Sequence, residues 1–138
     1  MATVTLDKEN FDQTMTESPM VVVDFWAPWC APCRMFGPVF EAASDKYADV
    51  VFGKVNTEEQ PELAGGFGIR SIPTLMIMRE KIILYSEPGA LSAGQLDAVL
   101  EQAKALDMET VHRELAEQQA KAASGEEMKM DKAATGEE

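Results

Sequence analysis

Both cysteines of the chain lie in one short stretch, Trp-Cys-Ala-Pro-Cys at residues 29–33. Two thiols separated by two residues can close a short disulfide and open it again. An apolar run over residues 20–26 precedes the pair, and the spacing of apolar residues predicts a helix over 34–47. A strand that leads through Cys30-x-x-Cys33 into a helix is typical of a redox site.

The rest of the chain supplies the elements that must position this pair. Residue patterns predict further strands over 3–6, 50–55, 73–78 and 82–85. They also predict three further helices: one with Asp7 as its N-cap, one that begins at Glu58, and one that opens with a capping box of Ser92 and Gln95. The predicted order is therefore βαβαβαββα. Strands that alternate with helices indicate an α/β fold with a central mixed sheet flanked by helices. The last two strands are expected to be antiparallel neighbours.

Composition excludes several classes of partner. The net charge of −12 argues against binding to nucleic acid or to an anionic membrane. No uncharged apolar stretch of the sequence approaches the roughly 18 residues that a membrane helix needs, and the first residues lack the pattern of a secretory signal. We therefore expect a cytoplasmic protein. In that reducing compartment a cysteine pair is more often catalytic, redox-sensing or metal-binding than structural.

The character of the sequence changes after residue 106. Residues 107–123 keep apolar side chains at helical spacing, whereas residues 124–138 are mostly small, polar or charged. We predict a compact domain over 1–106, a helical extension over 107–123 and a disordered acidic tail over 124–138.

Three blocks of the sequence resemble the thioredoxin family, in the right order. They are Asp-Phe-Trp-Ala-Pro-Trp-Cys-Ala-Pro-Cys at 24–33, Ile-Arg-Ser-Ile-Pro-Thr at 69–74, and the Gly-Ala-Leu-Ser portion of 88–92. The likeness covers about residues 1–106, and three blocks at consistent spacing are far more specific than a lone Cys-x-x-Cys. It implies the thioredoxin fold and protein-disulfide reductase activity.

The resemblance implies a role for each cysteine. Cys30 would be exposed at the helix start and would attack a target disulfide as a thiolate, and the more buried Cys33 would then resolve the mixed disulfide. Unsatisfied backbone N–H groups and the helix macrodipole favour an anion at Cys30.

Asp24 is the candidate proton acceptor for Cys33. It lies within the apolar run, where burial would raise the pKa of its carboxyl toward neutrality, so that it could take and return a proton. The resemblance gives the matching aspartate this role and pairs it with the lysine that matches Lys54. Two alternatives stay open: Asp24 at a strand edge facing water, and Lys54 as a solvated lysine at a strand end.

The resemblance also implies a cis peptide bond between Ile72 and Pro73 beside the cysteines, and docking of extended target segments by strand addition. The residues implied to contact substrate are Trp29, Ala31, Pro32, Ile72, Pro73, Gly89 and Ala90. No bound cofactor and no metal are implied. Electrons would come from NADPH through a thioredoxin reductase, and the other partners would be disulfide-containing target proteins. We expect a monomer.

Two positions depart from the family pattern. The dipeptide between the cysteines is usually Gly-Pro and here is Ala31-Pro32, which narrows the backbone conformations open to the site and leaves room for a different redox potential. The hairpin carries Arg-Glu-Lys at residues 79–81 where the family often has Asn-Gly, which leaves the turn type open.

Other uses of Cys-x-x-Cys fit less well. A structural zinc site takes four ligands, and the chain has two cysteines and one histidine; an iron–sulfur cluster fails in the same way. Disulfide oxidases and isomerases of this fold tend to carry histidine between the cysteines and to act outside the cytosol. A protein-binding module with secondary redox activity is the remaining alternative, motivated by the extension after residue 106.

Overall fold

The computed structural model describes residues 2–135. Its elements are β1 (Thr3–Thr5), α1 (Phe11–Glu17), β2 (Met20–Trp26), α2 (Ala31–Lys46), β3 (Val51–Asn56), α3 (Pro61–Gly66), β4 (Thr74–Arg79), β5 (Ile82–Pro88), α4 (Ala93–Ala105) and α5 (Met108–Thr135). This order confirms the predicted βαβαβαββα arrangement, with α5 after it.

The strands form one mixed sheet in the order β1-β3-β2-β4-β5. β3 runs parallel to both β1 and β2, whereas β4 is antiparallel to β2 and to β5. The predicted antiparallel hairpin at the end of the domain is therefore confirmed. β2 has a paired strand on each side, so the strand that leads to the cysteines lies inside the sheet.

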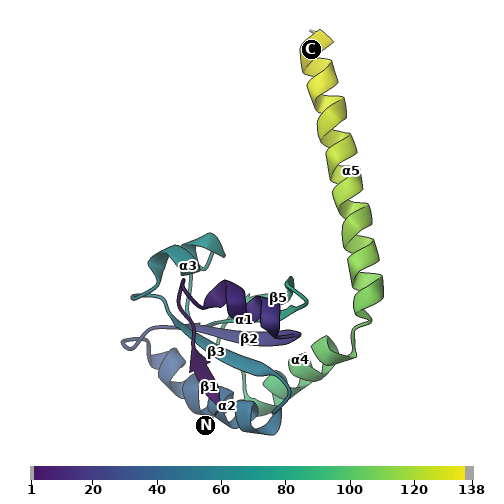
Figure 1. The fold of residues 1–138 in the computed structure, drawn as a ribbon. Helices are drawn as coiled ribbons and strands as arrows, with labels where there is room; N and C mark the ends of the chain where they lie inside the picture. The colour runs from purple at the N-terminus through teal and green to yellow at the C-terminus, as the bar shows by residue number, and fades with distance from the viewer. Residues whose placement is uncertain (1, 136–138) are drawn as a thin grey trace. The chain divides into compact units, whose positions relative to one another are not determined.

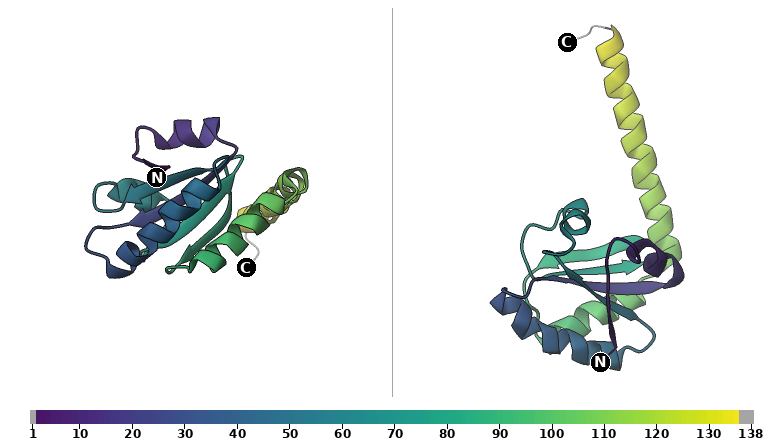
Figure 2. Two further views of the ribbon diagram at one scale, coloured as in Figure 1. Left: turned by 90° about the horizontal axis from the view of Figure 1, so that it is seen from below. Right: turned by 60° about the vertical axis from the view of Figure 1, so that its left-hand side comes forward.

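Helices cover both faces of this sheet. Apolar residues of α2 and α4 pack on one face, and those of α1 and α3 pack on the other. Figures 1 and 2 show these helices on the two sides of the sheet. Because both faces are covered, residues 20–25 of β2 are all buried, which explains why this strand reads as a continuous apolar run rather than an alternating one.

The N-cap residue of α1 differs from the predicted one, whereas the capping box predicted for α4 is present. Asp7 was predicted as the N-cap of the first helix, but its carboxylate accepts the backbone N–H of Asn10 at 2.9 Å and closes a turn before the helix. Asn10 is the residue at the N-cap position. Ser92 and Gln95 form the expected reciprocal capping box, with hydrogen bonds of 3.0 and 3.2 Å.

The two-residue turn between β4 and β5 is of type I′, which has positive φ at both central residues. Arg79 and Ile82 are paired residues, so Glu80 and Lys81 alone connect the strands. Both have positive φ, 51° and 68°. Two successive left-handed residues match the right-handed twist of a hairpin, and Asn-Gly is the usual choice there because these residues tolerate that conformation. The turn keeps the geometry without the usual residues.

The chain divides into two compact units, Met1–Ala105 and Leu106–Glu138. Within the second unit, α5 continues through residues 124–135, a segment for which the sequence predicts disorder. Its many Ala, Glu, Lys and Met residues have high helix propensity, which accounts for the difference. Residues 136–138 of the predicted tail lie outside the described residues. The division of the chain into three parts stays a prediction.

Lys81→Gly should stabilise the first unit by about 0.5 to 1 kcal/mol. The left-handed conformation costs an ordinary residue about 1–2 kcal/mol, from which the extra entropy that glycine loses on folding, about 0.5–1 kcal/mol, is subtracted. Lys81→Ala is the matched control, since it removes the same side chain and keeps the Cβ. Urea unfolding measures both, and equal effects of the two substitutions would show that the turn conformation is not the cause.

Candidate active site

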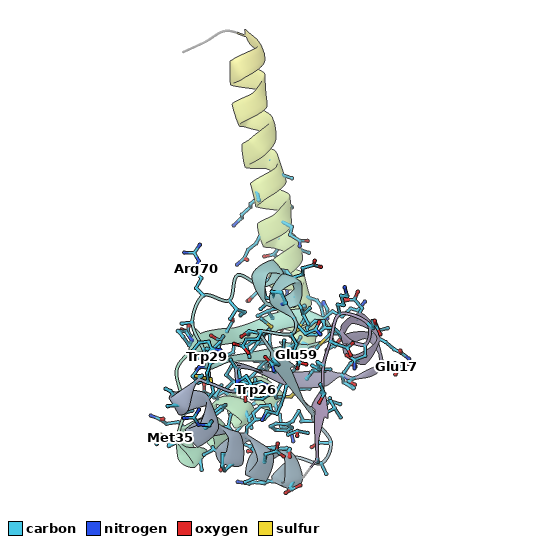
Figure 3. The ribbon with its side chains drawn as sticks, turned by 90° about the vertical axis from the view of Figure 1, so that its left-hand side faces the viewer. Glu17, Trp26, Trp29, Met35, Glu59 and Arg70 are labelled. Carbon is cyan, nitrogen blue, oxygen red and sulfur yellow. A yellow bond between two sulfur atoms is a disulfide. The ribbon has the colours of Figure 1, made fainter. Side chains whose placement is uncertain are left out.

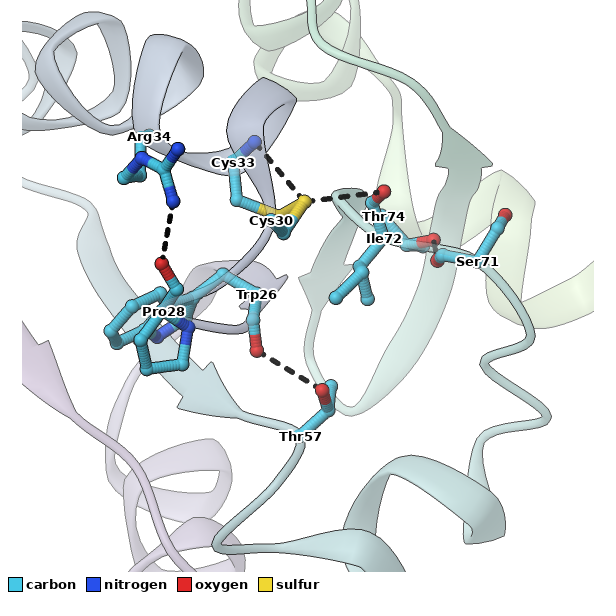
Figure 4. Close-up of a disulfide and its surroundings, with 9 residues drawn as sticks. All are labelled: Trp26, Pro28, Cys30, Cys33, Arg34, Thr57, Ser71, Ile72 and Thr74. Atoms are coloured by element: carbon cyan, nitrogen blue, oxygen red, sulfur yellow. Dashed lines mark hydrogen bonds between the residues drawn. A yellow bond between two sulfur atoms is a disulfide. The ribbon is translucent and has the colours of Figure 1, made fainter.

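The cysteine pair lies where β2 gives way to α2. Cys30 is the N-cap residue of α2, which begins at Ala31, three residues earlier than predicted. Cys30 and Cys33 are joined by a disulfide, with their Cα atoms 5.2 Å apart. Figure 4 shows this disulfide next to the loop that carries Ile72. The two sulfurs are therefore placed to bond to each other, which a dithiol–disulfide site requires.

The start of α2 provides an environment for a sulfur anion. The Sγ atom of Cys30 accepts the backbone N–H of Cys33 at 3.3 Å. An N-cap group of this kind also meets the positive end of the helix macrodipole. When the disulfide is reduced, both effects favour the thiolate of Cys30 over its thiol, and the thiolate is the nucleophilic form.

A second loop approaches the sulfur of Cys30. The carbonyl oxygen of Ile72 lies 3.7 Å from Sγ of Cys30, and the Ile72–Pro73 peptide bond is cis, as the resemblance implied. The backbone N–H of Gly89 donates to the carbonyl of Pro73 at 2.8 Å. This contact ties the residue after β5 to the same loop, which in turn approaches the disulfide through Ile72.

The burial of Cys30 corrects one expectation. The resemblance implied an exposed Cys30 and a more buried Cys33, but in the disulfide form their exposed fractions are 4% and 3%. Trp26, Ala27 and Ile72 pack around the pair and cover it. Exposure is instead found next to the pair, at Trp29, a residue that is 64% exposed and lies at the surface in Figure 3.

Backbone carbonyls before the cysteines are held by two residues that sequence reasoning did not single out. The guanidinium of Arg34 donates to the carbonyl of Pro28 at 2.9 Å, and the backbone N–H and hydroxyl of Thr57 donate to the carbonyl of Trp26 at 2.8 and 3.1 Å. Figure 4 shows the two side-chain contacts. Such contacts fix the path of the loop that carries the cysteines. Their acceptors are main-chain atoms, which leave no signal in the sequence.

Asp24 is fully buried, which confirms the predicted burial and rules out the alternative of a strand edge facing water. Within residues 2–135, neither of its carboxylate oxygens has a hydrogen-bond partner. Burial raises its pKa to about 7; the positive charge of Lys54 opposes this rise and the negative charge of Glu41 adds to it. The carboxyl therefore exchanges its proton near neutral pH.

Lys54 lies opposite Asp24 in the pairing of β2 with β3, but its ammonium approaches other groups. The Nζ atom lies 4.0 Å from a carboxylate oxygen of Glu41 and 4.8 Å from the centre of the Trp26 ring. Its side chain is 23% exposed, so the alternative of a fully solvated lysine is wrong. Lys54 is therefore the partner of Asp24 in the register of the two strands, as implied, but it forms its ion pair with Glu41.

The residues implied to contact substrate differ in exposure. Ile72 is half-buried against the cysteines and Pro73 is buried, whereas the others are exposed: Trp29, Ala31, Pro32, Gly89 and Ala90. The exposed residues adjoin the disulfide in sequence or follow β5 next to Pro73. Their part in binding stays a prediction.

Clusters of metal-ligating side chains and membrane-spanning helices are both absent from the described part of the chain. No group of three or more His, Cys, Asp or Glu side chains there could hold a metal ion. Over the same residues, no helix is both long and apolar enough to span a bilayer.

Comparison with known proteins decides the family. The family model for thioredoxin matches residues 2–102 of the chain. The chain belongs to the thioredoxin family. It is 57% identical over 121 residues to a putative thioredoxin 2 of Streptomyces coelicolor, covering 88% of this chain and 90% of that one. It is 43% identical over 104 residues to a thioredoxin of Alicyclobacillus acidocaldarius, covering 71% of this chain and 99% of the other.

Solved structures agree with this assignment. A thioredoxin of Malassezia sympodialis superimposes with a TM-score of 0.66 at 36% identity, covering 72% of this chain and 89% of that one. A mutant thioredoxin of Halobacterium salinarum superimposes with a TM-score of 0.70 at 26% identity, covering 76% and 92%. The thioredoxin fold is therefore established for this chain. Thioredoxins are thiol–disulfide oxidoreductases, and the cysteine pair on which their chemistry depends is present at disulfide distance.

The stability of this thioredoxin should depend on pH through Asp24. The carboxyl loses its proton near its ordinary pKa of 3.8 when unfolded but only near a pKa of about 7 when folded. Between these values the folded state binds more protons, so the contribution of Asp24 to stability is greatest below about pH 4, declines as the pH rises to about 7 and then levels off.

Asp24→Asn should abolish this decline. The amide cannot ionise, so the variant should exceed the wild type in free energy of unfolding at pH 8 by up to about 4 kcal/mol, the equivalent of a shift of about three pKa units. At pH 4 the two proteins should be nearly equal. Urea unfolding at several pH values measures the difference, and parallel pH profiles would contradict the raised pKa.

Proposed function

We propose that this thioredoxin is a protein-disulfide reductase that donates two electrons from the Cys30/Cys33 dithiol to disulfides in target proteins. The main structural support for this proposal is the cysteine pair at the N-terminus of α2, which forms a disulfide next to the carbonyl of Ile72. Family membership supports the same reaction.

The first step uses Cys30 as the nucleophile. Its thiolate attacks one sulfur of the target disulfide, a mixed disulfide forms, and the second target sulfur leaves as a thiolate that takes a proton from water. The N–H of Cys33, which donates to the sulfur of Cys30, and the helix macrodipole support the attacking anion. In the reduced protein the thiol of Cys30 can also donate to the carbonyl of Ile72.

The second step uses Cys33 as the resolving thiol and Asp24 as its proton acceptor. The proton of Cys33 passes to the carboxylate of Asp24, and the Cys33 thiolate attacks the sulfur of Cys30. The bond to the target breaks, the target sulfur leaves reduced, and the Cys30–Cys33 disulfide is restored. A pKa of about 7 suits Asp24 to both receiving and releasing this proton. Lys54 modulates the carboxyl through its charge.

Target proteins are proposed to dock next to the disulfide as extended segments. The main chain of Ile72 supplies hydrogen-bonding groups for strand addition, and Trp29 offers a large exposed ring beside the sulfurs. Exposed apolar surface of this sort suits recognition of several partners. The proposed contact residues are Trp29, Ala31, Pro32, Ile72, Pro73, Gly89 and Ala90.

We propose that NADPH supplies the electrons through a thioredoxin reductase, with no cofactor bound to this chain. The protein is proposed to act as a monomer in the cytoplasm, where the reducing environment suits a dithiol whose two cysteines are the only ones in the chain.

Turnover of insulin disulfides should depend on both cysteines. With NADPH and a thioredoxin reductase, the wild type should oxidise NADPH and precipitate reduced insulin, whereas Cys30→Ser should abolish turnover because no nucleophile remains. Cys33→Ser should instead trap a mixed disulfide with insulin, visible by mass spectrometry. Normal turnover by Cys30→Ser would refute the proposed reaction.

A binding module with secondary redox activity is the second candidate. The match to the Streptomyces protein spans 121 residues, more than the 105 of the first unit, so it reaches into the second unit, which contains the long helix α5. Partner binding that survives Cys30→Ser, together with absent reductase turnover, would favour this candidate.

Removal of residues 124–138 should leave reductase turnover within about twofold of the full chain, because the proposed chemistry uses residues of the first unit alone. The same insulin assay measures this. Cys30→Ser in the shortened chain is the matched control for background reduction. A large loss of turnover would show that the end of α5 takes part in the reaction or in docking.

A further inference from the structure

A third charged residue lies near Asp24 and Lys54, which are partners in the register of β2 and β3. Glu41 of α2 places one carboxylate oxygen 4.0 Å from the Nζ atom of Lys54. The hydroxyl of Thr3 donates to the same oxygen at 2.9 Å, so residues from β1, β3 and α2 meet at this carboxylate. No sequence pattern singles out Glu41, because it is one of many polar residues on a helix.

The surroundings of Lys54 direct its ammonium toward α2. Gly37 lies one helical turn before Glu41, and a Cβ atom at Gly37 would come within 4.0 Å of Nζ of Lys54. The ring of Trp26 lies under the ammonium at 4.8 Å. The aromatic ring of Trp26 and the carboxylate of Glu41 therefore bound the place that the ammonium occupies, next to Gly37 of α2.

The ion pair of Lys54 and Glu41 is partly shielded from water. The side chains of Lys54 and Glu41 are 23% and 20% exposed. The second carboxylate oxygen of Glu41 is buried, and it has no hydrogen-bond partner among the residues described. Charges in such a setting interact more strongly than charges on an open surface, because less water screens them.

We propose that Glu41 is a positioning residue of the redox site, which holds the ammonium of Lys54 against α2 and out of direct contact with the carboxyl of Asp24. This proposal rests on the proposed role of Asp24 as the proton acceptor of Cys33.

The charged groups that act on Asp24 come from two elements. Lys54 of β3 favours its ionised form and Glu41 of α2 opposes it. On the side of β2 that pairs with β4, the register partner of Asp24 is the apolar Leu75. If Lys54 paired directly with Asp24, the carboxylate would be stabilised and would be a weaker proton acceptor. With the ammonium held by Glu41, the carboxyl keeps enough basicity to take the proton of a thiol.

The test is an NMR titration of the Asp24 side-chain carboxyl carbon in the oxidised full chain. Glu41→Gln should lower the midpoint by about one pH unit, since a nearby charge commonly shifts a carboxyl by that much or more. Lys54→Gln should raise the midpoint, which gives a second reading that does not require the Glu41 variant to fold. Glu62→Gln, which removes one exposed carboxylate from α3, is the matched control and should leave the midpoint unchanged.

The double variant tests whether Glu41 acts through Lys54. In the Lys54→Gln background, Glu41→Gln should shift the Asp24 midpoint by less than half of its effect in the wild type, because no ammonium remains to be released. An equal shift in both backgrounds would overturn the positioning role, as would an unchanged midpoint in Glu41→Gln or a midpoint that does not rise in Lys54→Gln.

Failure of this proposal can be told apart from failure of the proposed reaction. The titration is read in the oxidised protein without any turnover. If Asp24→Asn left the rate of the resolving step unchanged, the proton-acceptor role of Asp24 would fail, whatever the titrations of the Glu41 and Lys54 variants showed. If that rate fell but the titration midpoint of Asp24 did not change in Glu41→Gln, only the proposed positioning role of Glu41 would fail.

Discussion

The confinement of β2 between two paired strands and two helical layers is the constraint on which the site depends. β3 and β4 bond to its edges, and α2, α4, α1 and α3 cover its faces. A shift of register by one residue would exchange its two buried faces, so the register is strongly fixed. This fixed strand directs Asp24 into the core and carries the chain from Trp26 to the start of α2, where Cys30 becomes the N-cap.

Those parts of the fold and site that depend on short-range patterns could be predicted from the sequence. The apolar run at 20–26, the capping box of Ser92 and Gln95, and the cysteine spacing each carry their own local physical cause. The burial of Asp24 was also predictable, because an acidic residue inside a strand that is apolar on both faces has no route to water.

Contacts between distant segments could not be predicted in the same way. Glu41 and Lys54 meet because α2 crosses β3, and the sulfur of Cys30 is covered because the loop at Ile72 packs on it. The hydrogen bond from Arg34 to Pro28 ends on a carbonyl, which every residue possesses. For α5, helix propensity and a polar composition pointed in opposite directions at residues 124–135, and the structure follows propensity.

The ionised carboxyl of Asp24 lowers the stability of the fold, yet the proposed chemistry needs this ionised form to accept a proton. A shift of about three pKa units corresponds to roughly 4 kcal/mol of destabilisation once the carboxyl ionises, a large share of the 5–15 kcal/mol that holds a typical domain together. A close ion pair with Lys54 would offset much of this cost, but it would also fix Asp24 as a carboxylate with little affinity for a proton. The ammonium instead lies against Glu41, near enough to Asp24 to moderate the cost of ionisation and outside direct contact. In the proposed mechanism, the distance between these charges therefore decides whether the buried carboxyl is a structural anion or the proton acceptor of the dithiol.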